Sequence, residues 1–484
     1  MKLSKPILFA IVVASCFFGN VFSQDSVGFR LEMFGSVATS HTTPFWIVNN
    51  TYGKVPLAAN NMYLSEEFFW KHKFNEDFRM SINADLVTAG NHSSSFFVQQ
   101  LYGEIEWQAL CLSIGSKERY NSILDRRLSS GDFTYSTNAR PIPEVNLSIP
   151  RYTKIPFFKE FLQFRGDFAV GKSIDNNYIL DAKASDQGYT LDILWHHKSA
   201  YFLLEDPEKK FPFSVTFGFE HGVQWGGKTS FYYIEEMPHS LKDMVKVMLG
   251  KGGGEDAPDG EQINRLGNHV GTYNFKLNYA AHLFNVGVYK QHYFDDNSGM
   301  EYANWRDGIW GMECAFYNQN YLKKVVVEYV NTTNQSGPVH ILNTDRPVRG
   351  GGNDDYYNNM LYPSGWSHFG RGLGNPLITS PEYNDDGVLH FKNNRIKALH
   401  LGFEGAIDKN ISYRLLVTKT NAWGRMTYPF LEKKTDLSTM AEFNYTNPKW
   451  AGWDFGIQLA FDQGSLYNDN FGCSFKISKS GVIK

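Results

Sequence analysis

Hydrophobic residues alternate with polar or small ones over many short stretches of this chain. In residues 453–461, for example, every second residue is large and apolar. The same period of two recurs in residues 78–86, 273–279, 399–403 and 471–477. Side chains of a β-strand point alternately to its two faces, so each stretch predicts a strand with one apolar and one polar face.

The connections between these stretches alternate in length. Toward the C-terminus, a tight turn at residues 408–410 precedes a long connection at 420–435, a short one at 446–452 and a longer one at 462–470. A soluble β-sandwich or propeller also has alternating strands, but outer-membrane barrels additionally join their strands by short periplasmic turns and longer outer loops. We therefore predict an all-β fold, a transmembrane antiparallel β-barrel of about 18 strands with long extracellular loops.

The same parity predicts which segments face outward. If the last strand ends in the periplasm, residues 117–159, 229–265 and 331–394 lie outside the cell. These three segments are the longest outer connections, so they are where a ligand-binding surface is expected.

One outer loop is predicted to carry a short helix. Apolar residues recur at helical spacing from Leu241 to Leu249, with Ser240 before them and Gly250 after them. Two roles remain open for this helix, a lid over the barrel mouth or a cover for its own loop, and helical stripes more often serve plain packing.

The start of the chain predicts export. Two lysines and the apolar run of residues 6–18 precede a cleavage site at residues 21–23. The run is too short to span a membrane as a helix. We therefore predict a signal peptide at residues 1–23 and one outer-membrane barrel domain at residues 24–484.

A lipoprotein signal is the alternative interpretation of the same region. Val13–Cys16 resembles a lipobox, which would place acyl chains on Cys16. Phe17 and Phe18 continue the apolar run where a lipoprotein usually turns polar, so cleavage after Ser23 is the favoured prediction.

Composition narrows the functional classes. A net charge of −3 and a pI near 6.5 give no basic stripe for nucleic acid. The four cysteines are widely spaced and form no zinc or disulfide pattern, so no metal and no cofactor is predicted. Aromatic residues make up 16% of a chain whose mean hydropathy is −0.37, which is typical of a barrel with a wet lumen and aromatic girdles.

Several segments together resemble the Wzi family of capsule-assembly proteins, in its Bacteroides-type form. The resemblance covers nearly the whole mature chain and is carried by Thr43–Trp46, Ala139–Pro143, Gly218–Gly227, Leu266–His269 and Gly374–Pro381. It implies an outer-membrane lectin-like barrel that retains exported capsular polysaccharide on the cell surface. The better-known members also have a periplasmic helical bundle, which we cannot place in this sequence.

The predicted outer loops contain the residue types that bind sugars. Aromatic rings stack on the apolar faces of sugars, and Asp, Asn and Arg form bidentate hydrogen bonds with hydroxyl or acidic groups. The cluster is a stronger signal than any member, because single residues of this kind are more often girdle aromatics or solvated charges. The candidate carbohydrate-binding residues of these loops are Arg140, Trp305, Arg306, Arg349, Tyr356, Tyr357, Trp366 and Arg371. Glu220, Gln224 and Trp225 are further candidates, expected to face a saccharide path from the end of a strand.

Two other motifs suggest chemistry that we do not expect. Residues 222–229 match the P-loop pattern, but extended chain is predicted where a nucleotide site needs a helix. His196 and His197 point to opposite faces of a strand and cannot ligate one ion. Glu220 and Glu235–Glu236 could be a glycosidase pair only if they faced one sugar, which spacing does not establish. No catalytic residue is predicted.

The expected partners follow from this interpretation. They are capsular or surface polysaccharide, outer-membrane lipid and, during biogenesis, the barrel-assembly machinery, with no nucleic acid. The main alternative is an outer-membrane porin for small solutes, which the polar lumen positions would also suit. An outer-membrane enzyme comes third.

Overall fold

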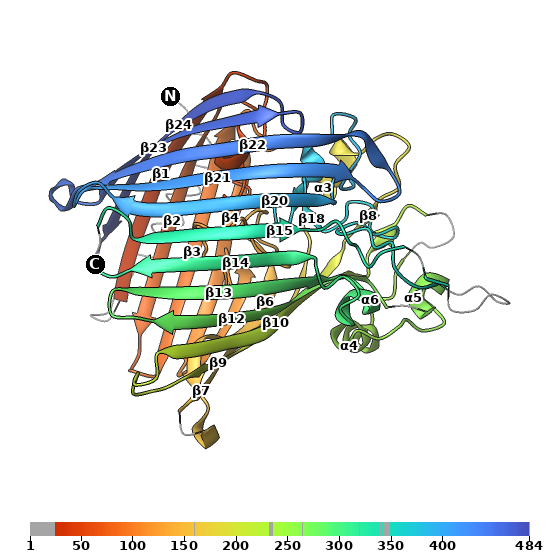
Figure 1. Cartoon of the computed structure of the whole chain (residues 1–484), viewed down its shortest axis with the longest axis horizontal. Coiled ribbons are helices and arrows are strands. Elements are labelled where there is room, and N and C mark those ends of the chain that lie inside the picture. The colour runs from red at the N-terminus through yellow and green to blue at the C-terminus, as the bar shows by residue number, and fades with distance from the viewer. Residues whose placement is uncertain are drawn as a thin grey trace.

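The structure is a computed structural model that describes residues 25–483, apart from residues 159, 232–235, 264, 319, 339 and 342–348. The predicted leader at residues 1–23, and with it the lipidation alternative at Cys16, lies outside the described residues. The described chain forms one barrel, shown in Figure 1 with its axis nearly horizontal.

Eighteen antiparallel strands form one closed sheet. Each strand pairs with the next along the chain, and β1 closes the ring by pairing with β24. The predicted fold class and strand number are therefore confirmed. The strands are β1 (Asp25–Ala38), β2 (Asn61–Lys73), β3 (Phe78–Gly90), β4 (Phe96–Trp107), β5 (Leu110–Ser116), β6 (Glu144–Lys154), β7 (Leu162–Lys172), β9 (Leu194–Glu205), β10 (Phe213–Trp225), β12 (Asn268–Ala280), β13 (Phe284–Phe294), β14 (Gly308–Phe316), β15 (Lys324–Asn331), β20 (Ile396–Ala406), β21 (Ile411–Gly424), β22 (Pro429–Thr446), β23 (Trp453–Gly464) and β24 (Asn470–Val482).

Connections at the two ends of the barrel differ in length, as the sequence predicted. Short turns join the strands at the left end in Figure 1, and the longest loops gather at the right end. We assign the right end to the cell exterior. Two boundaries were wrong. Residues 420–435 are mostly the ends of β21 and β22, and residues 144–158 form β6 and a turn at the opposite end, so the outer segment is 117–143.

Apolar side chains cover the outward face of the strands. On β1, for example, Met33 and Val37 are exposed while Phe34 is buried inside. Exposed Trp107 and Trp453 lie at strand ends on the periplasmic side, where a barrel has an aromatic girdle. The alternation in sequence therefore corresponds to lipid on one face and the lumen on the other.

Helices and short sheets occur mainly in the outer loops. The helices are α2 (Phe45–Val48), α3 (Asn176–Ala182), α4 (Leu241–Leu249), α5 (Asp259–Ile263) and α6 (Asn297–Met300), with 3-10 turns η1 (Pro156–Phe158), η2 (Pro381–Tyr383) and η3 (Pro448–Trp450); the short sheets are β8 (Thr190–Leu191) with β11 (Lys228–Thr229), β16 (His340–Ile341) with β17 (Arg349–Gly351), and β18 (Ser367–His368) with β19 (Arg371–Gly372). No helix in the described part of the chain has the length and apolar character needed to cross a membrane. The predicted helix in residues 241–249 is confirmed as α4, with a Ser240–Asp243 capping box and Gly250 in the left-handed conformation after it.

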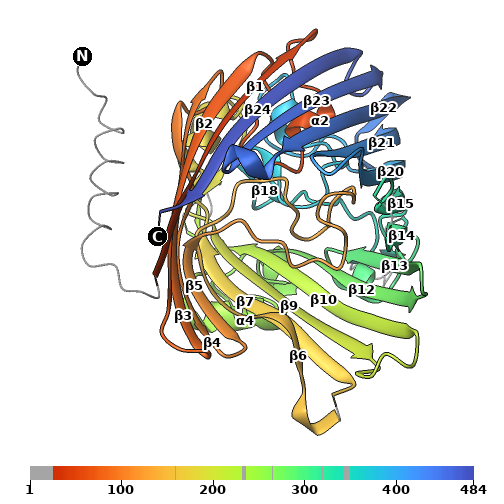
Figure 2. The ribbon, with the colours of Figure 1, turned by 90° about the vertical axis from the view of Figure 1, so that its left-hand side faces the viewer.

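The outer loop of residues 117–143, here called the plug, folds into the lumen. Figure 2, which looks along the barrel, shows this segment crossing the interior. Leu128 and Phe133 of the plug are fully buried and join a cluster that includes Tyr357 and Trp366 of the longest outer loop. The hydrophobic core of the protein therefore lies inside the barrel, between the plug and the loop of residues 332–395.

Candidate functional site

The plug is held by a buried carboxylate on β15. Glu328 accepts hydrogen bonds from the Ser129 hydroxyl at 2.7 Å, the Ser130 backbone N–H at 2.8 Å and the Tyr289 hydroxyl at 2.8 Å. Three donors satisfy most of the acceptor positions of one carboxylate, as burial requires. This part of the plug is therefore fixed to the lumen wall.

The plug also reaches strands on other sides of the ring. Thr134 and Thr272 of β12 share a hydrogen bond of 3.1 Å, and Phe133 donates its backbone N–H to Gln291 of β13 at 2.9 Å. Arg127 bonds to Glu442 of β22 at 3.4 Å. Because these contacts are spread around the barrel wall, they fix the plug inside the lumen.

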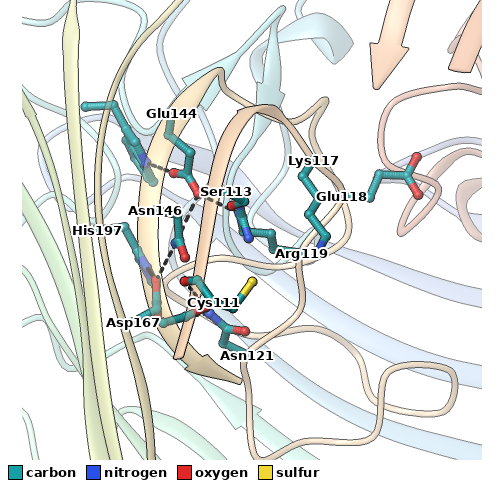
Figure 3. Close-up of polar contacts among 12 residues, drawn as sticks. Cys111, Ser113, Lys117, Glu118, Arg119, Asn121, Glu144, Asn146, Asp167 and His197 are labelled. Atoms are coloured by element: carbon teal, nitrogen blue, oxygen red, sulfur yellow. Dashed lines mark hydrogen bonds and ion pairs between the residues drawn. The ribbon is translucent and has the colours of Figure 1, made fainter. Parts of the chain in front are cut away.

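The base of the plug meets the wall of β6, β7 and β9 in a polar network, shown in Figure 3. Arg119 pairs with Glu144 at 2.7 Å, and Asn121 donates to Asp167 at 2.9 Å. His197 lies 2.9 Å from the same Asp167. Beside this network is a cavity of about 300 Å³, lined by charged residues of the lumen such as Glu104. The network positions the plug and leaves a polar space on its periplasmic side.

A second space opens at the outer end of the barrel, and we call it the outer cleft. It has a volume of about 490 Å³, within the size range of small-ligand sites. It is formed by five outer loops and the ends of their strands. Its lining residues are His41, Thr42, Gly53, Pro56, Leu57, Ala58, Asn91, His92, Ser93, Arg140, Tyr178, Phe369, Arg371, Glu382, Tyr383 and Asp385.

Arg140 is the charged centre of the outer cleft. Its guanidinium lies 4.3 Å from the ring centroid of Phe97 and 3.9 Å from that of Phe369, so it is held between two aromatic faces. Burial lowers the pKa of Arg140 to about 10, which still leaves it charged at neutral pH. Within the described residues no carboxylate forms an ion pair with it. This cation is therefore placed to receive an anionic group.

Arg371 has a different role in the same cleft. It pairs with Glu382 at 2.7 Å and donates to the backbone carbonyls of Val48 and Val55 at 2.7 and 2.8 Å. Burial raises the pKa of Glu382, and the nearby Arg371 opposes that shift. Arg371 therefore joins two outer loops and fixes Glu382 at the cleft wall.

His92 stacks on the ring of Phe97, one of the two rings that hold Arg140. Its ring centroid lies 4.8 Å from that of Phe97, and burial, followed by repulsion from Arg140, lowers the pKa of His92 to about 4. His92 is neutral at physiological pH as a result. Its Nδ1 accepts a hydrogen bond from the Ser94 backbone N–H at 3.1 Å, and as a neutral ring it does not compete for the anion that Arg140 attracts.

Two of the eleven predicted binding residues, Arg140 and Arg371, come together in the outer cleft. Trp305 and Arg306 lie exposed on the loop before β14, where the guanidinium is 5.3 Å from the indole ring. Arg349 begins β17, and its side chain lies outside the described part.

The other six residues are buried in the barrel interior or against its wall. Tyr357 donates to the Phe133 carbonyl at 2.6 Å and Trp366 to the Thr134 carbonyl at 2.8 Å, so both hold the plug. Tyr356 donates to Asp307 at 2.8 Å within the outer loops. Glu220, Gln224 and Trp225 are buried on β10, with Glu220 accepting from Tyr201 at 2.6 Å, Gln224 accepting from Asn268 at 2.9 Å and Trp225 packed under α4.

Cleft residues that the sequence did not single out are Tyr178, Phe369, Glu382 and Tyr383. Tyr178 is on α3 and the other three belong to the longest loop, so they come from segments nearly 200 residues apart. Phe369 and Tyr383 lie close in sequence to the predicted residues Trp366 and Arg371, and this proximity could have identified them. No periodicity could show that Tyr178 would join them.

The P-loop pattern lies at the end of a barrel strand, and a group of three aspartates lies in the outer loops. The segment Gly222–Thr229 ends β10, turns through two glycines with positive φ and enters β11, so no helix follows it. Asp295, Asp296 and Asp354 have carboxyl oxygens within 4.8 Å of one another. Ser298 and Ser336 donate to this group, and burial raises the pKa of Asp295, so a shared proton accounts for it as well as a cation does.

Comparisons with known proteins place this architecture. The family model of the capsule assembly protein Wzi matches residues 32–380, and no curated protein matches the chain. Among solved structures it is similar to Wzi of Escherichia coli, described as an outer membrane protein involved in group 1 capsule assembly and a carbohydrate-binding β-barrel. That similarity has 13% identity and a TM-score of 0.58, and it covers 93% of this chain and 83% of that one.

A second similar structure is OccAB2 of Acinetobacter baumannii, with 8% identity and a TM-score of 0.50 over 96% of this chain and 100% of that one. Both similarities concern the fold. The closed barrel with a lipid-facing belt is an integral outer-membrane structure with its long loops outside. Because the family model covers well over half of the sequence, the chain belongs to the Wzi family of capsule assembly proteins.

Proposed function

We propose that this protein retains exported capsular polysaccharide at the cell surface by binding it in the outer cleft. The observation that carries the proposal is the position of Arg140, a buried cation between two aromatic rings in an outward-facing space of about 490 Å³. The Wzi of Escherichia coli, which has the same fold, is described as carbohydrate-binding.

The lining of the cleft suits an acidic sugar. Arg140 supplies charge-assisted hydrogen bonds to a carboxylate or similar anion, and Asp385 and Asn91 offer polar groups for hydroxyls. Tyr178 and Tyr383 offer ring faces for the apolar side of a sugar. We therefore propose a capsule containing acidic residues as the ligand.

The plug favours retention over diffusion. Contacts from residues 117–143 to β12, β13, β15 and β22 occupy the part of the lumen that a solute would cross in a porin. Purified protein in planar bilayers should therefore show no steady conductance. A large, continuous conductance would support the porin alternative instead.

We also propose that the bound glycan is not cleaved. Glu220, the carboxylate first considered for hydrolysis, is 1% exposed and faces the interior, where it bonds to Tyr201. A glycosidase needs two carboxyl groups on either side of a bound sugar. Incubation with purified capsule oligosaccharide should leave its chain length unchanged, and cleavage lost in Glu220→Gln would overturn this part.

The decisive experiment is in the cell. Deleting the gene should shed capsule into the medium while total polysaccharide stays the same, and an Arg140→Gln copy should fail to restore retention. An Arg306→Gln copy, which changes an exposed arginine outside the cleft, should restore it. Unchanged surface retention in the deletion strain would sink the proposal. Outer-membrane lipid and the barrel-assembly machinery complete the proposed partners.

A further inference from the structure

One sector of the barrel wall has polar side chains on the face that should meet lipid. Trp195 and His197 of β9 point into the lumen, because they bond to Glu144 and Asp167. Strand alternation then places His196 and Lys198 on the outward face. On neighbouring strands, His221 of β10 and His269 of β12 share a hydrogen bond of 2.9 Å on the same outward face.

Such a patch cannot face hydrocarbon without a large penalty. The patch is covered, since His196, His221 and His269 are all buried. The cover includes helix α4, which lies beside the right-hand ends of β10 and β12 in Figure 1.

Helix α4 contacts the outer wall directly. Lys198 donates to the carbonyl of Met248, and Val247 and Met244 pack against Val223, Trp225 and Leu194 of the strands. The helix is therefore neither a lid over the barrel mouth nor a cover for its own loop. It covers the outward face of β9 and β10 at their outer ends.

The opposite face of α4 is apolar and exposed. Leu241, Val245 and Leu249 follow one another at spacings of four residues, and they are 79%, 48% and 62% exposed. At 100° per residue this stripe lies roughly opposite Val247, the residue that faces the wall. Lys242 is exposed on one flank of the stripe, and Lys246 beside it pairs with Asp243 at 3.2 Å.

We propose that α4 lies in the outer leaflet of the outer membrane, with Leu241, Val245 and Leu249 among the acyl chains of the lipid. Three observations support this occupant. The stripe continues the apolar belt, which elsewhere reaches the outer strand ends at Val37 and Met62. Exposed Lys242, on the flank of the stripe, suits the anionic headgroup layer above the chains. The capping box and Gly250 make the helix well defined. The inference is independent of what the outer cleft binds.

Spin labels on α4 test the proposal. Cys111, Cys314 and Cys473 are first replaced by alanine, and single cysteines are then introduced at Val245 or at Lys242. The labelled protein is reconstituted in vesicles of phosphatidylcholine and lipopolysaccharide. Collision with oxygen, which concentrates in lipid, is compared with collision with a water-soluble nickel chelate.

The ratio of oxygen to nickel collisions at position 245 should be several-fold higher than at 242. It should match a label at Met33, which lies on the lipid-facing side of β1. A label at Asp385, on an exposed outer loop, gives the aqueous value. An aqueous ratio at 245 would overturn the proposal.

A label at Val247 separates two kinds of failure. Val247 is fully buried against the wall, so its label should be immobile in the same vesicles. A mobile spectrum there would mean that α4 leaves the wall, and the proposal would also fail. Capsule retention does not enter any of these measurements, so the result is separable from the lectin proposal.

Discussion

The Ser129 hydroxyl donates a 2.7 Å hydrogen bond to the carboxylate of Glu328, and this contact joins the middle of the plug to β15. The same carboxylate also receives the next backbone N–H of the plug at 2.8 Å. One acidic side chain of the wall thus holds two consecutive residues of the plug.

Replacing Glu328 by alanine should open the lumen. The change leaves three buried donors without an acceptor, at roughly 1–3 kcal/mol for each. The plug should loosen, and planar-bilayer recordings should show conductance that the parent protein lacks. The matched control is Glu67→Ala, since Glu67 accepts from Asn83 on the wall and, among the described residues, forms no hydrogen bond or ion pair with the plug. Equal conductance in both variants would contradict the anchoring role of Glu328.

Arg140→Gln should weaken binding of an acidic capsule oligosaccharide by about 10- to 100-fold, the equivalent of one charge-assisted contact. Arg140→Lys should recover only part of the affinity, because lysine lacks the planar group held between Phe97 and Phe369. Calorimetry on detergent-purified protein measures both. Arg306→Gln serves as the control. If only this variant lost oligosaccharide affinity, the binding site would be assigned to the loop of residues 295–307 instead.

Tyr178 should contribute a ring face rather than its hydroxyl. Tyr178→Phe should keep oligosaccharide affinity within about two-fold, whereas Tyr178→Ala should lower it several-fold. Tyr302→Ala removes an exposed tyrosine from another outer loop and should have no effect. If Phe and Ala variants lose affinity equally, the hydroxyl and not the ring is responsible.

The loop that carries α4 should dock more firmly at low pH. Burial raises the pKa of Glu261 to about 7, and its carboxylate accepts from the Gly267 N–H at 3.0 Å. A carboxyl with a raised pKa binds more protons when folded, so the docked loop is favoured at acidic pH. That advantage, on the order of 3 kcal/mol, is lost as the pH rises from about 4.5 to about 7.

Hydrogen-exchange protection factors, which correct for the intrinsic effect of pH, measure this docking. Protection of the Gly267 amide, which donates to the Glu261 carboxylate, and of the Gly253 amide, which donates to the Glu261 backbone carbonyl, should fall between pH 5 and pH 8. Glu261→Gln keeps an acceptor without a charge and should remove the dependence. A pH dependence that persists in this variant would assign the effect to another group.

The barrel could be predicted from the sequence because its rules are local. A strand such as Trp453–Gly464 shows the lipid and lumen faces in every second residue, and turn length shows the side of the membrane. The error at residues 420–435 has the same origin. There β21 and β22 extend as a hairpin beyond the lipid, where the alternation no longer needs to be apolar.

The site was harder to predict, because binding and packing use the same residue types. Trp366 and Tyr357 have the composition of a sugar platform, yet they donate hydrogen bonds to the plug and are buried. The sequence cannot show that the loop of residues 117–143 turns inward and needs such partners. Arg140 was identified, but the ring of Phe97 beneath it comes from a strand end 43 residues earlier.

The plug is synthesised early, and its partners arrive late. Arg127 bonds to Glu442, which follows it by 315 residues. Contacts between such distant residues form slowly. We therefore expect this side of the plug to be fixed only after the last hairpins are in place, later than its anchors on β12, β13 and β15. Closing the pore on all sides is then a late step of maturation.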